Sequence, residues 1–409
     1  MVEQTEGEVM QKLALVASAA ALVAAMGMQS SARAADEITI GFAIAQSGWM
    51  NAYDGPPFVG AKIAIDDINA KGGVLGKKLK WVSADTKSDQ TEGAKAGQAV
   101  LADGAQFMAV SCDYDMGAGA ATVANSKKII AISFCASDAK MGVQGIGPYA
   151  FTMSTSSLTS GASLAEFAWK KGWRNAYILL DTSIEYDKAI CGGFRTRWAK
   201  LGGNMLGEDS YKQDDASIAS QITRVQETEK AKGKIDFMMN CSYGAGGISS
   251  IRQIRAAGLN MPLGAGDSMD GDYWAKGIPH LSDHYTGTYG SAFGDDPRPA
   301  YNEFMDKVAK VAGERLPTSF AICGYSVVQA FVLAIERAKS TDSDKVLAEF
   351  NKFKDEPFAV GPTSYTSELH INLMRPIAIM GIKDGKGYFD TLVQLPEPPP
   401  LELIFKKKS

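Results

Sequence analysis

A stretch near the start of the chain, residues 38–81, sets the architecture that the rest of the chain can adopt. Residues 38–44 form an uncharged run rich in β-branched residues, which is typical of a strand buried on both faces of a sheet. A turn follows at 54–57, and apolar residues three and four apart over 58–68 predict an amphipathic helix. Two glycines then end the helix, and residues 76–82 begin a second strand. Strand, helix and strand in this order predict a parallel pair with a right-handed crossover.

The same alternation of strands and helices continues to about residue 265. A polar segment at 154–160 separates a first series of elements from a second series of the same kind. The two series predict an α/β chain with two doubly wound lobes, each built on a parallel sheet. The strands expected after residue 82 are 107–112, 129–134, 149–153, 176–181, 205–210, 235–241 and 262–265.

The amino terminus has the pattern of a secretory signal peptide. Lys12 precedes an apolar run at 13–26, and the small residues Ala32 and Ala34 flank the cleavage position, which would fall after Ala34. A membrane anchor is the alternative, but the run is shorter than the ~20 apolar residues that a spanning helix needs. Residues 1–34 are therefore expected to direct export to the periplasm and to be removed there.

The chain contains five cysteines and no Cys-x-x-Cys motif, so they do not form a disulfide scaffold. Cys112 and Cys135 each close a predicted strand, and these two strands should be neighbours in the sheet. Export to an oxidising compartment would permit a bridge between them. The alternative is a set of buried free thiols, which cysteine tolerates well.

Charge and motifs argue against two other classes of protein. A net charge of −4 gives no basis for nucleic-acid binding. The sequence contains no Gly-x-Ser-x-Gly elbow, P-loop or dinucleotide fingerprint after the first strand. His280 and His284 are four residues apart but lack the glutamate of the zinc-protease pattern. We therefore expect a protein that is not an enzyme and that uses no cofactor or metal.

The first strand–helix–strand unit resembles that of the branched-chain amino-acid (Leu/Ile/Val) binding proteins, type I periplasmic binding proteins that serve ABC importers. The resemblance lies in the strand at 38–44, Ser47 and Gly48 followed by an aromatic residue, Asn-Ala-Lys-Gly-Gly at 69–73 and Gly-Lys-Lys-Leu at 76–79. With the layout of the elements it covers about residues 38–395. It implies an exported monomer whose lobes close on a small solute and deliver it to an ABC permease and its ATPase.

The later elements and this resemblance together predict where the chain passes between the lobes. Helices at 300–312, 318–338 and 345–353 would return to the first lobe, and a hairpin at 376–393 would return to the second. Lobe 1 is expected to comprise residues 37–154 and 288–361, lobe 2 residues 155–287 and 362–395, and a disordered tail residues 396–409. Three chain segments would then form a hinge between two lobes that each carry a crevice.

Ligands of doubly wound sheets lie at the carboxyl ends of the strands, and six such ends mix small residues with hydroxyls, aromatic rings or carboxylates. The resemblance matches Ala136 and Ser137 to the strand end that holds an amino acid's carboxylate. It places Asp267 about where the glutamate that binds the ammonium group is expected. The expected ligand-binding residues are Trp49, Tyr53, Asp113, Tyr114, Asp115, Ala136, Ser137, Asp138, Tyr186, Tyr243 and Asp267.

One departure from the family leaves the ligand open. Where the family has serines at the third strand end, this chain has aspartates at 113 and 115. A carboxylate that faced a ligand carboxylate would repel it by on the order of several kcal/mol in a water-poor crevice. Either these aspartates point away from an amino acid, or the ligand is an amide, amine, polyol or aromatic acid. The expected role is solute import, and the alternative is a periplasmic receptor subunit that senses a short-chain amide, amine or aromatic acid.

Overall fold

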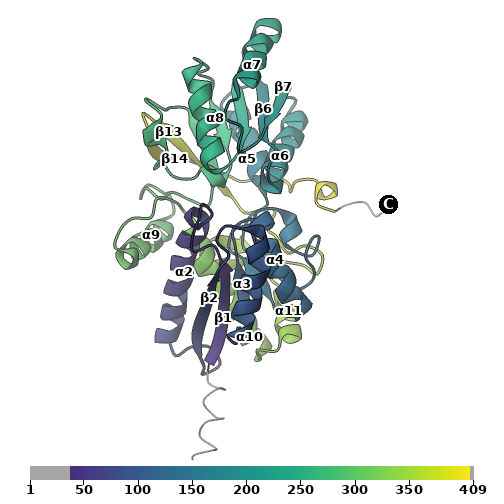
Figure 1. Ribbon diagram of the computed structural model, residues 1–409, viewed down its shortest axis with the longest axis vertical. Helices are drawn as coiled ribbons and strands as arrows, with labels where there is room; N and C mark the ends of the chain where they lie inside the picture. The colour runs from purple at the N-terminus through teal and green to yellow at the C-terminus, as the bar shows by residue number, and fades with distance from the viewer. Residues whose placement is uncertain (1–36, 406–409) are drawn as a thin grey trace, which may run out of the picture.

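The structure, a computed structural model, describes residues 37–405 and consists of two α/β lobes stacked end to end (Figure 1). The predicted signal peptide, residues 1–34, lies outside the described residues. Each lobe is built on its own sheet, and a third, two-stranded sheet joins β11 (Glu356–Phe358) to β12 (Gly361–Thr363). The prediction of two doubly wound parallel-sheet lobes is therefore confirmed.

The sheet of lobe 1 has the strand order β2-β1-β3-β4-β5, and every neighbouring pair is parallel. Helices α2 and α10 cover one face of this sheet, and α3 and α4 cover the other. The strands are β1 (Glu37–Ile44), β2 (Lys78–Asp85), β3 (Phe107–Val110), β4 (Ala131–Ser133) and β5 (Ala150–Thr152). The helices are α2 (Asn51–Ala70), α3 (Gln90–Ala102), α4 (Tyr114–Ser126), α9 (Pro299–Ala312), α10 (Ala321–Ala338) and α11 (Ser343–Phe350).

The sheet of lobe 2 has the order β14-β13-β10-β9-β8-β6-β7. Its five strands from β7 to β10 are parallel and repeat the topology of lobe 1, while β13 and β14 add an antiparallel edge. The strands are β6 (Asn175–Asp181), β7 (Asn204–Tyr211), β8 (Phe237–Cys241), β9 (Leu263–Ala265), β10 (His284–Thr288), β13 (Ile377–Lys383) and β14 (Lys386–Val393). The helices are α5 (Ser157–Lys170), α6 (Glu185–Leu201), α7 (Ala219–Lys232) and α8 (Gly244–Ala256).

Helix α2 begins earlier than the sequence predicts. We expected a turn at 54–57, but the helix starts at Asn51 and contains Pro56 and Pro57. Proline removes a backbone donor and disfavours a helix interior. Here the buried Asp54 carboxylate accepts hydrogen bonds from two strand ends, which holds the first turn in place. A tertiary contact therefore overrides the local signal of the two prolines.

The last passage between the lobes also differs from the expected one near Pro362. The His370 ring stacks on Phe151 of β5 with the ring centroids 3.7 Å apart, and the His370 carbonyl accepts a hydrogen bond from the Thr152 N–H. Residues 365–370 thus pack on lobe 1, whereas Ile371 and Leu373 pack against Leu158 of α5 in lobe 2. We propose that the third crossing lies at about residues 371–375, before the chain joins the lobe 2 sheet at β13.

The end of the chain differs from the predicted disordered tail at 396–409. The structure places residues 396–405, which run along α6 to the junction of the lobes. Glu397 pairs with Arg197 of α6 at 2.6 Å, and Ile404 packs against Leu158. The four prolines explain why this segment can be ordered, because a stiff chain loses less entropy when it docks.

Two disulfides connect elements within the lobes. The predicted Cys112–Cys135 bridge is present in lobe 1. A second bridge, Cys191–Cys241, joins α6 to the end of β8 in lobe 2 and was not predicted. Cys323 is buried and unpaired.

We therefore expect one free thiol per chain when the protein is denatured without reductant and titrated with a thiol reagent. Replacing Cys191 and Cys241 by serine opens a loop of 50 residues and should lower the free energy of unfolding by about 2–4 kcal/mol. The melting temperature should fall by about 4–12 °C. The control Cys323→Ala keeps both bridges and should have a smaller effect. More than one thiol in the denatured, unreduced protein would contradict the pairing.

Candidate functional site

A cavity lies between the carboxyl edges of the two sheets and takes its walls from both lobes. The cavity is small, and residues of both lobes form its walls. It is lined by Trp49, Met50, Tyr53, Cys112, Asp113, Cys135, Ser137 and Phe320 on the lobe 1 side, and by Ile184, Tyr186, Tyr243, Asp267 and Ser268 on the lobe 2 side.

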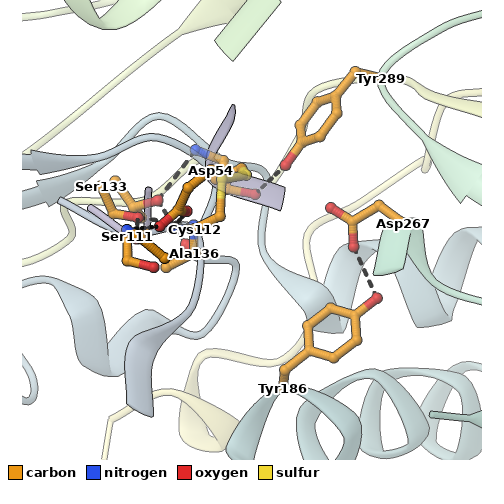
Figure 2. Close-up of a disulfide and its surroundings, with 12 residues drawn as sticks. Asp54, Ser111, Cys112, Ser133, Ala136, Tyr186, Asp267 and Tyr289 are labelled. Carbon is orange, nitrogen blue, oxygen red and sulfur yellow. Dashed lines mark hydrogen bonds between the residues drawn. A yellow bond between two sulfur atoms is a disulfide. The ribbon is translucent and has the colours of Figure 1, made fainter. Parts of the chain in front are cut away.

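Asp54 organises the lobe 1 wall. Its side chain is fully buried, and its carboxylate accepts hydrogen bonds from the Ala45 N–H at 2.7 Å and the Cys112 N–H at 2.8 Å. Figure 2 shows Asp54 beside the Cys112–Cys135 disulfide. Burial raises the pKa of the Asp54 carboxyl to about 6, although both N–H groups oppose this shift. The contacts tie the ends of β1 and β3 together and position the first turn of α2, which carries Tyr53.

Ser133 and the disulfide shape the next part of this wall. The Ser133 hydroxyl donates to the Ser111 carbonyl at 2.6 Å and accepts the Ala136 N–H at 2.9 Å (Figure 2). The Ala136 N–H is therefore already engaged within the lobe. The next residue, Ser137, lines the cavity, and its buried hydroxyl has no hydrogen-bond partner within residues 37–405.

Asp113 is the carboxylate of the lobe 1 wall. It caps α4 by accepting the Met116 N–H at 3.1 Å. Burial, together with the negative charges of Asp115 and Asp138, raises its pKa to about 7. A pKa near 7 is consistent with a carboxyl that has no positive side chain beside it in the described lining of the cavity.

Asp267 is the carboxylate of the lobe 2 wall. The Tyr186 hydroxyl donates to its Oδ1 atom at 2.8 Å and accepts the Ser268 N–H at 3.2 Å (Figure 2). Burial raises the pKa of Asp267 to about 6. Gly266 is required here, because a Cβ atom at this position would lie 1.9 Å from the Tyr186 hydroxyl.

Direct contacts hold the lobes together around the cavity. The Tyr53 hydroxyl of lobe 1 donates to the Ser268 carbonyl of lobe 2 and accepts the Gly244 N–H, both at 3.1 Å. The Trp49 ring lies 5.5 Å from the Tyr243 ring, measured between centroids. On another side of the junction, Lys140 pairs with Glu185. The structure is thus that of a closed form.

Seven of the eleven predicted residues meet at this cavity, and four do not. Tyr114 and Asp138 line a separate, larger groove of about 650 Å³ at the edge of the junction. The Asp115 carboxylate accepts the Glu185 N–H at 3.2 Å, and Ala136 is buried beneath the wall. The seven that line the cavity are Trp49, Tyr53, Asp113, Ser137, Tyr186, Tyr243 and Asp267.

Sequence reasoning missed several residues of the wall. Met50 follows Trp49 and Ser268 follows Asp267, so the sequence pattern identified the two strand ends that contain them. Ile184 lies in the turn before Tyr186 but has no polar atom to mark it. Phe320 precedes α10, which is far from any strand end in the sequence, and only tertiary packing brings it to the cavity.

Comparison with known proteins places this geometry in a family. The family model described as "Periplasmic binding protein" matches residues 37–387. The Leu/Ile/Val-binding protein BraC3 of Rhizobium johnstonii is 23% identical over 351 residues, which cover 85% of this chain and 91% of that protein.

Solved structures share the fold at low sequence identity. The branched-chain amino acid transporter substrate binding protein LivJ of Streptococcus pneumoniae, in complex with isoleucine, aligns with a TM-score of 0.76 and 22% identity over 88% of this chain and all of that one. A solute binding protein of an ABC transporter from Rhodopseudomonas palustris, in complex with 3,4-dihydroxybenzoic acid, aligns with a TM-score of 0.74 and 19% identity. The alignment covers 88% of this chain and 97% of that one. The two-lobed fold therefore holds different classes of solute in different proteins.

The raised pKa of Asp113 predicts how stability depends on pH. The folded protein retains a proton up to about pH 7 that the unfolded chain, with an ordinary pKa of 3.8, releases earlier. This contribution to stability is complete below about pH 4 and is lost as the pH rises through about 7. Asp113→Asn cannot ionise and caps a helix equally well, so its melting temperature should exceed that of the wild type by about 3–8 °C at pH 8 and match it at pH 4.

The control for this measurement is Asp306→Asn, which makes the same change in net charge on the exposed face of α9. Its melting temperature should follow that of the wild type at both pH values. An Asp113→Asn variant that is equally destabilised at pH 4 and pH 8 would show that the carboxylate is not under electrostatic stress.

Proposed function

The chain belongs to the periplasmic binding protein family, and on that premise we propose that it is the extracytoplasmic solute-binding component of an ABC importer. It captures a small polar solute, an amino acid or a related compound, between its lobes and delivers it to a membrane permease and its ATPase. Proteins of this family bind solutes and do not transform them. Export to the periplasm and removal of residues 1–34 belong to the same proposal.

One observation carries this proposal: a small cavity at the junction is lined by polar and aromatic groups from both lobes. Because its open space is so small, a solute enters only when the lobes separate. The segments that connect the lobes provide that motion, since a few residues at such crossings can absorb a change of backbone angles. A solute that contacts both walls stabilises the closed form only as far as it binds that form better than the open one.

The relatives support the binding of a small solute but do not identify which solute this chain binds. Isoleucine and 3,4-dihydroxybenzoic acid are bound by other proteins of this fold. This chain is only 22% and 19% identical to these two proteins. The solute that it binds is therefore inferred from the residues that line its own cavity and not from theirs.

A thermal-shift screen tests the proposal, because a solute that binds only the folded protein raises its melting temperature. The panel contains amino acids, amides, amines, polyols and aromatic acids. Small-angle scattering with and without the best solute then compares the radius of gyration, which should fall on binding. Failure of every solute class to bind, or chemical conversion of the bound solute, would overturn the proposal.

Tyr53→Phe should weaken solute binding by opening the lobes. The change removes both hydrogen bonds that the hydroxyl makes to lobe 2, each worth about 0.5–1.5 kcal/mol. The dissociation constant for the solute found in the screen should rise about 5- to 100-fold in calorimetric titration. The ligand-free variant should also have a larger radius of gyration than the wild type.

Tyr325→Phe is the matched control. Its hydroxyl donates to Asp67 at 2.9 Å within lobe 1 and makes no contact with lobe 2 in the described structure. Its affinity for the solute should equal that of the wild type. Equal losses in both variants would show that the Tyr53 effect is a loss of lobe 1 stability rather than of closure.

A further inference from the structure

Resting on the proposed function, we infer that the solute is a small organic cation, an alkylammonium ion that carries no carboxylate. Its positive charge would lie between Asp113 of lobe 1 and Asp267 of lobe 2. Both side chains line the cavity, and both are only 8% exposed. A cation would therefore bridge the two lobes through charge, which is what a closing ligand must do.

No lysine, arginine or histidine lines the cavity in the part of the chain that the structure describes. The nearby cations are engaged elsewhere. Lys140 and Lys188 both pair with Glu185 at the edge of the junction. Arg375 is buried and donates to the Met153 carbonyl at 2.9 Å and to the Thr363 hydroxyl at 2.8 Å. An anionic solute would find no positive partner at this site.

Three N–H groups that could replace a cation in binding a carboxylate are also engaged. The Cys112 N–H is bound by Asp54, and the Ala136 N–H by the Ser133 hydroxyl. Met116, in the first turn of α4, donates its N–H to the chain's own Asp113 carboxylate. Asp113 thus occupies the position at this helix terminus where an external anion would otherwise bind. The strand end that resembles the carboxylate site of the family still offers a carboxylate the Ser137 hydroxyl, but the described residues that line the cavity supply it no positive side chain.

The remaining wall suits an alkylammonium ion. Five aromatic rings line the cavity, from Trp49, Tyr53, Tyr186, Tyr243 and Phe320. Aromatic faces attract cations, and rings that surround a site are a known means of holding quaternary ammonium groups. The rings also supply apolar area for the alkyl part of the solute.

Two further features point in the same direction. The buried Ser137 hydroxyl, without a partner among the described residues, can accept a hydrogen bond from an ammonium N–H. Behind the lobe 2 wall, Asp187 is fully buried, and neither of its carboxylate oxygens has a partner within residues 37–405. Burial raises the pKa of Asp187, and the charges of Asp181 and Asp113 raise it further. A solute cation would supply a positive charge to the cavity, whose described lining has none.

Three related probes test the inference on the unaltered protein: leucine, 3-methylbutylamine, which is leucine without its carboxylate, and 4-methylpentanoate, which is leucine without its ammonium group. Calorimetric titration at pH 8 should give a dissociation constant for 3-methylbutylamine at least tenfold lower than that for leucine. It should give no binding of 4-methylpentanoate. Tetramethylammonium and 1,4-diaminobutane then distinguish a quaternary ion from a diamine within the same class.

Asp267→Asn and Asp113→Asn test whether the carboxylates of both walls bind the cation. Each should raise the dissociation constant for the best cation about 10- to 100-fold, while the Tyr186 hydroxyl keeps an oxygen acceptor in Asp267→Asn. Asp306→Asn, on the surface of α9, should leave it unchanged. Melting curves of both variants show that they are folded, and the comparison of probes on the wild type stands without them.

The outcomes separate the inference from the function on which it rests. Tighter binding of leucine, another amino acid or an aromatic acid than of any cation overturns the inference and leaves the solute-binding function in place. Failure of every class of solute to bind overturns both. Tight binding of a cation that is unaffected by either aspartate variant also overturns the inference.

Discussion

Two parallel sheets that face each other with their carboxyl edges must satisfy, away from water, every polar group that ends there. This constraint organises the junction. In lobe 1, Asp54 binds the N–H groups that end β1 and begin the turn after β3. In lobe 2, Tyr186 satisfies both Asp267 and Ser268. Each lobe thereby presents a rigid wall, because a buried donor or acceptor left without a partner would cost about 1–3 kcal/mol.

The two walls differ from ordinary protein interior in one respect, which is the number of carboxyl groups. Asp113 and Asp267 line the cavity, whose lining has no positive side chain among the described residues, and Asp187 is fully buried. Burial raises the pKa of all three, because the charged form of a carboxyl is costly away from water. A positively charged solute between the walls would lower this cost, and closure and charge neutralisation would then be the same event.

The chain connectivity makes this closure mechanically simple. Both lobes share one topology, so both present their strand ends to the same junction (Figure 1). The sheets imply that the chain passes between the lobes after β5, after β10 and before β13. The segment at 396–405 adds a contact from α6 to the outer side of this junction.

Much of the fold and about half of the wall follow from the sequence, since both depend on local pattern. Uncharged strands followed by amphipathic helices predict parallel sheets, and parallel sheets place their strand ends together. Tyr53, Ser137, Tyr186, Tyr243 and Asp267 could be found in this way because each lies in such an end.

The direction of each side chain could not be predicted from pattern alone. Asp113 faces the cavity as the cap of α4, but the helix then turns by about 100° per residue, which carries Tyr114 to the outer groove and Asp115 to the α6 contact. The start of α2 depends on a hydrogen bond from a residue 58 positions away, and the Cys191–Cys241 bridge spans 50 residues.

The sequence by itself determined the two-lobed α/β architecture, because the period of its apolar residues is a local property. Only the tertiary structure decided which donors remain available at the cavity, because the N–H groups of Cys112, Ala136 and Met116 are engaged by side chains that folding brings to them.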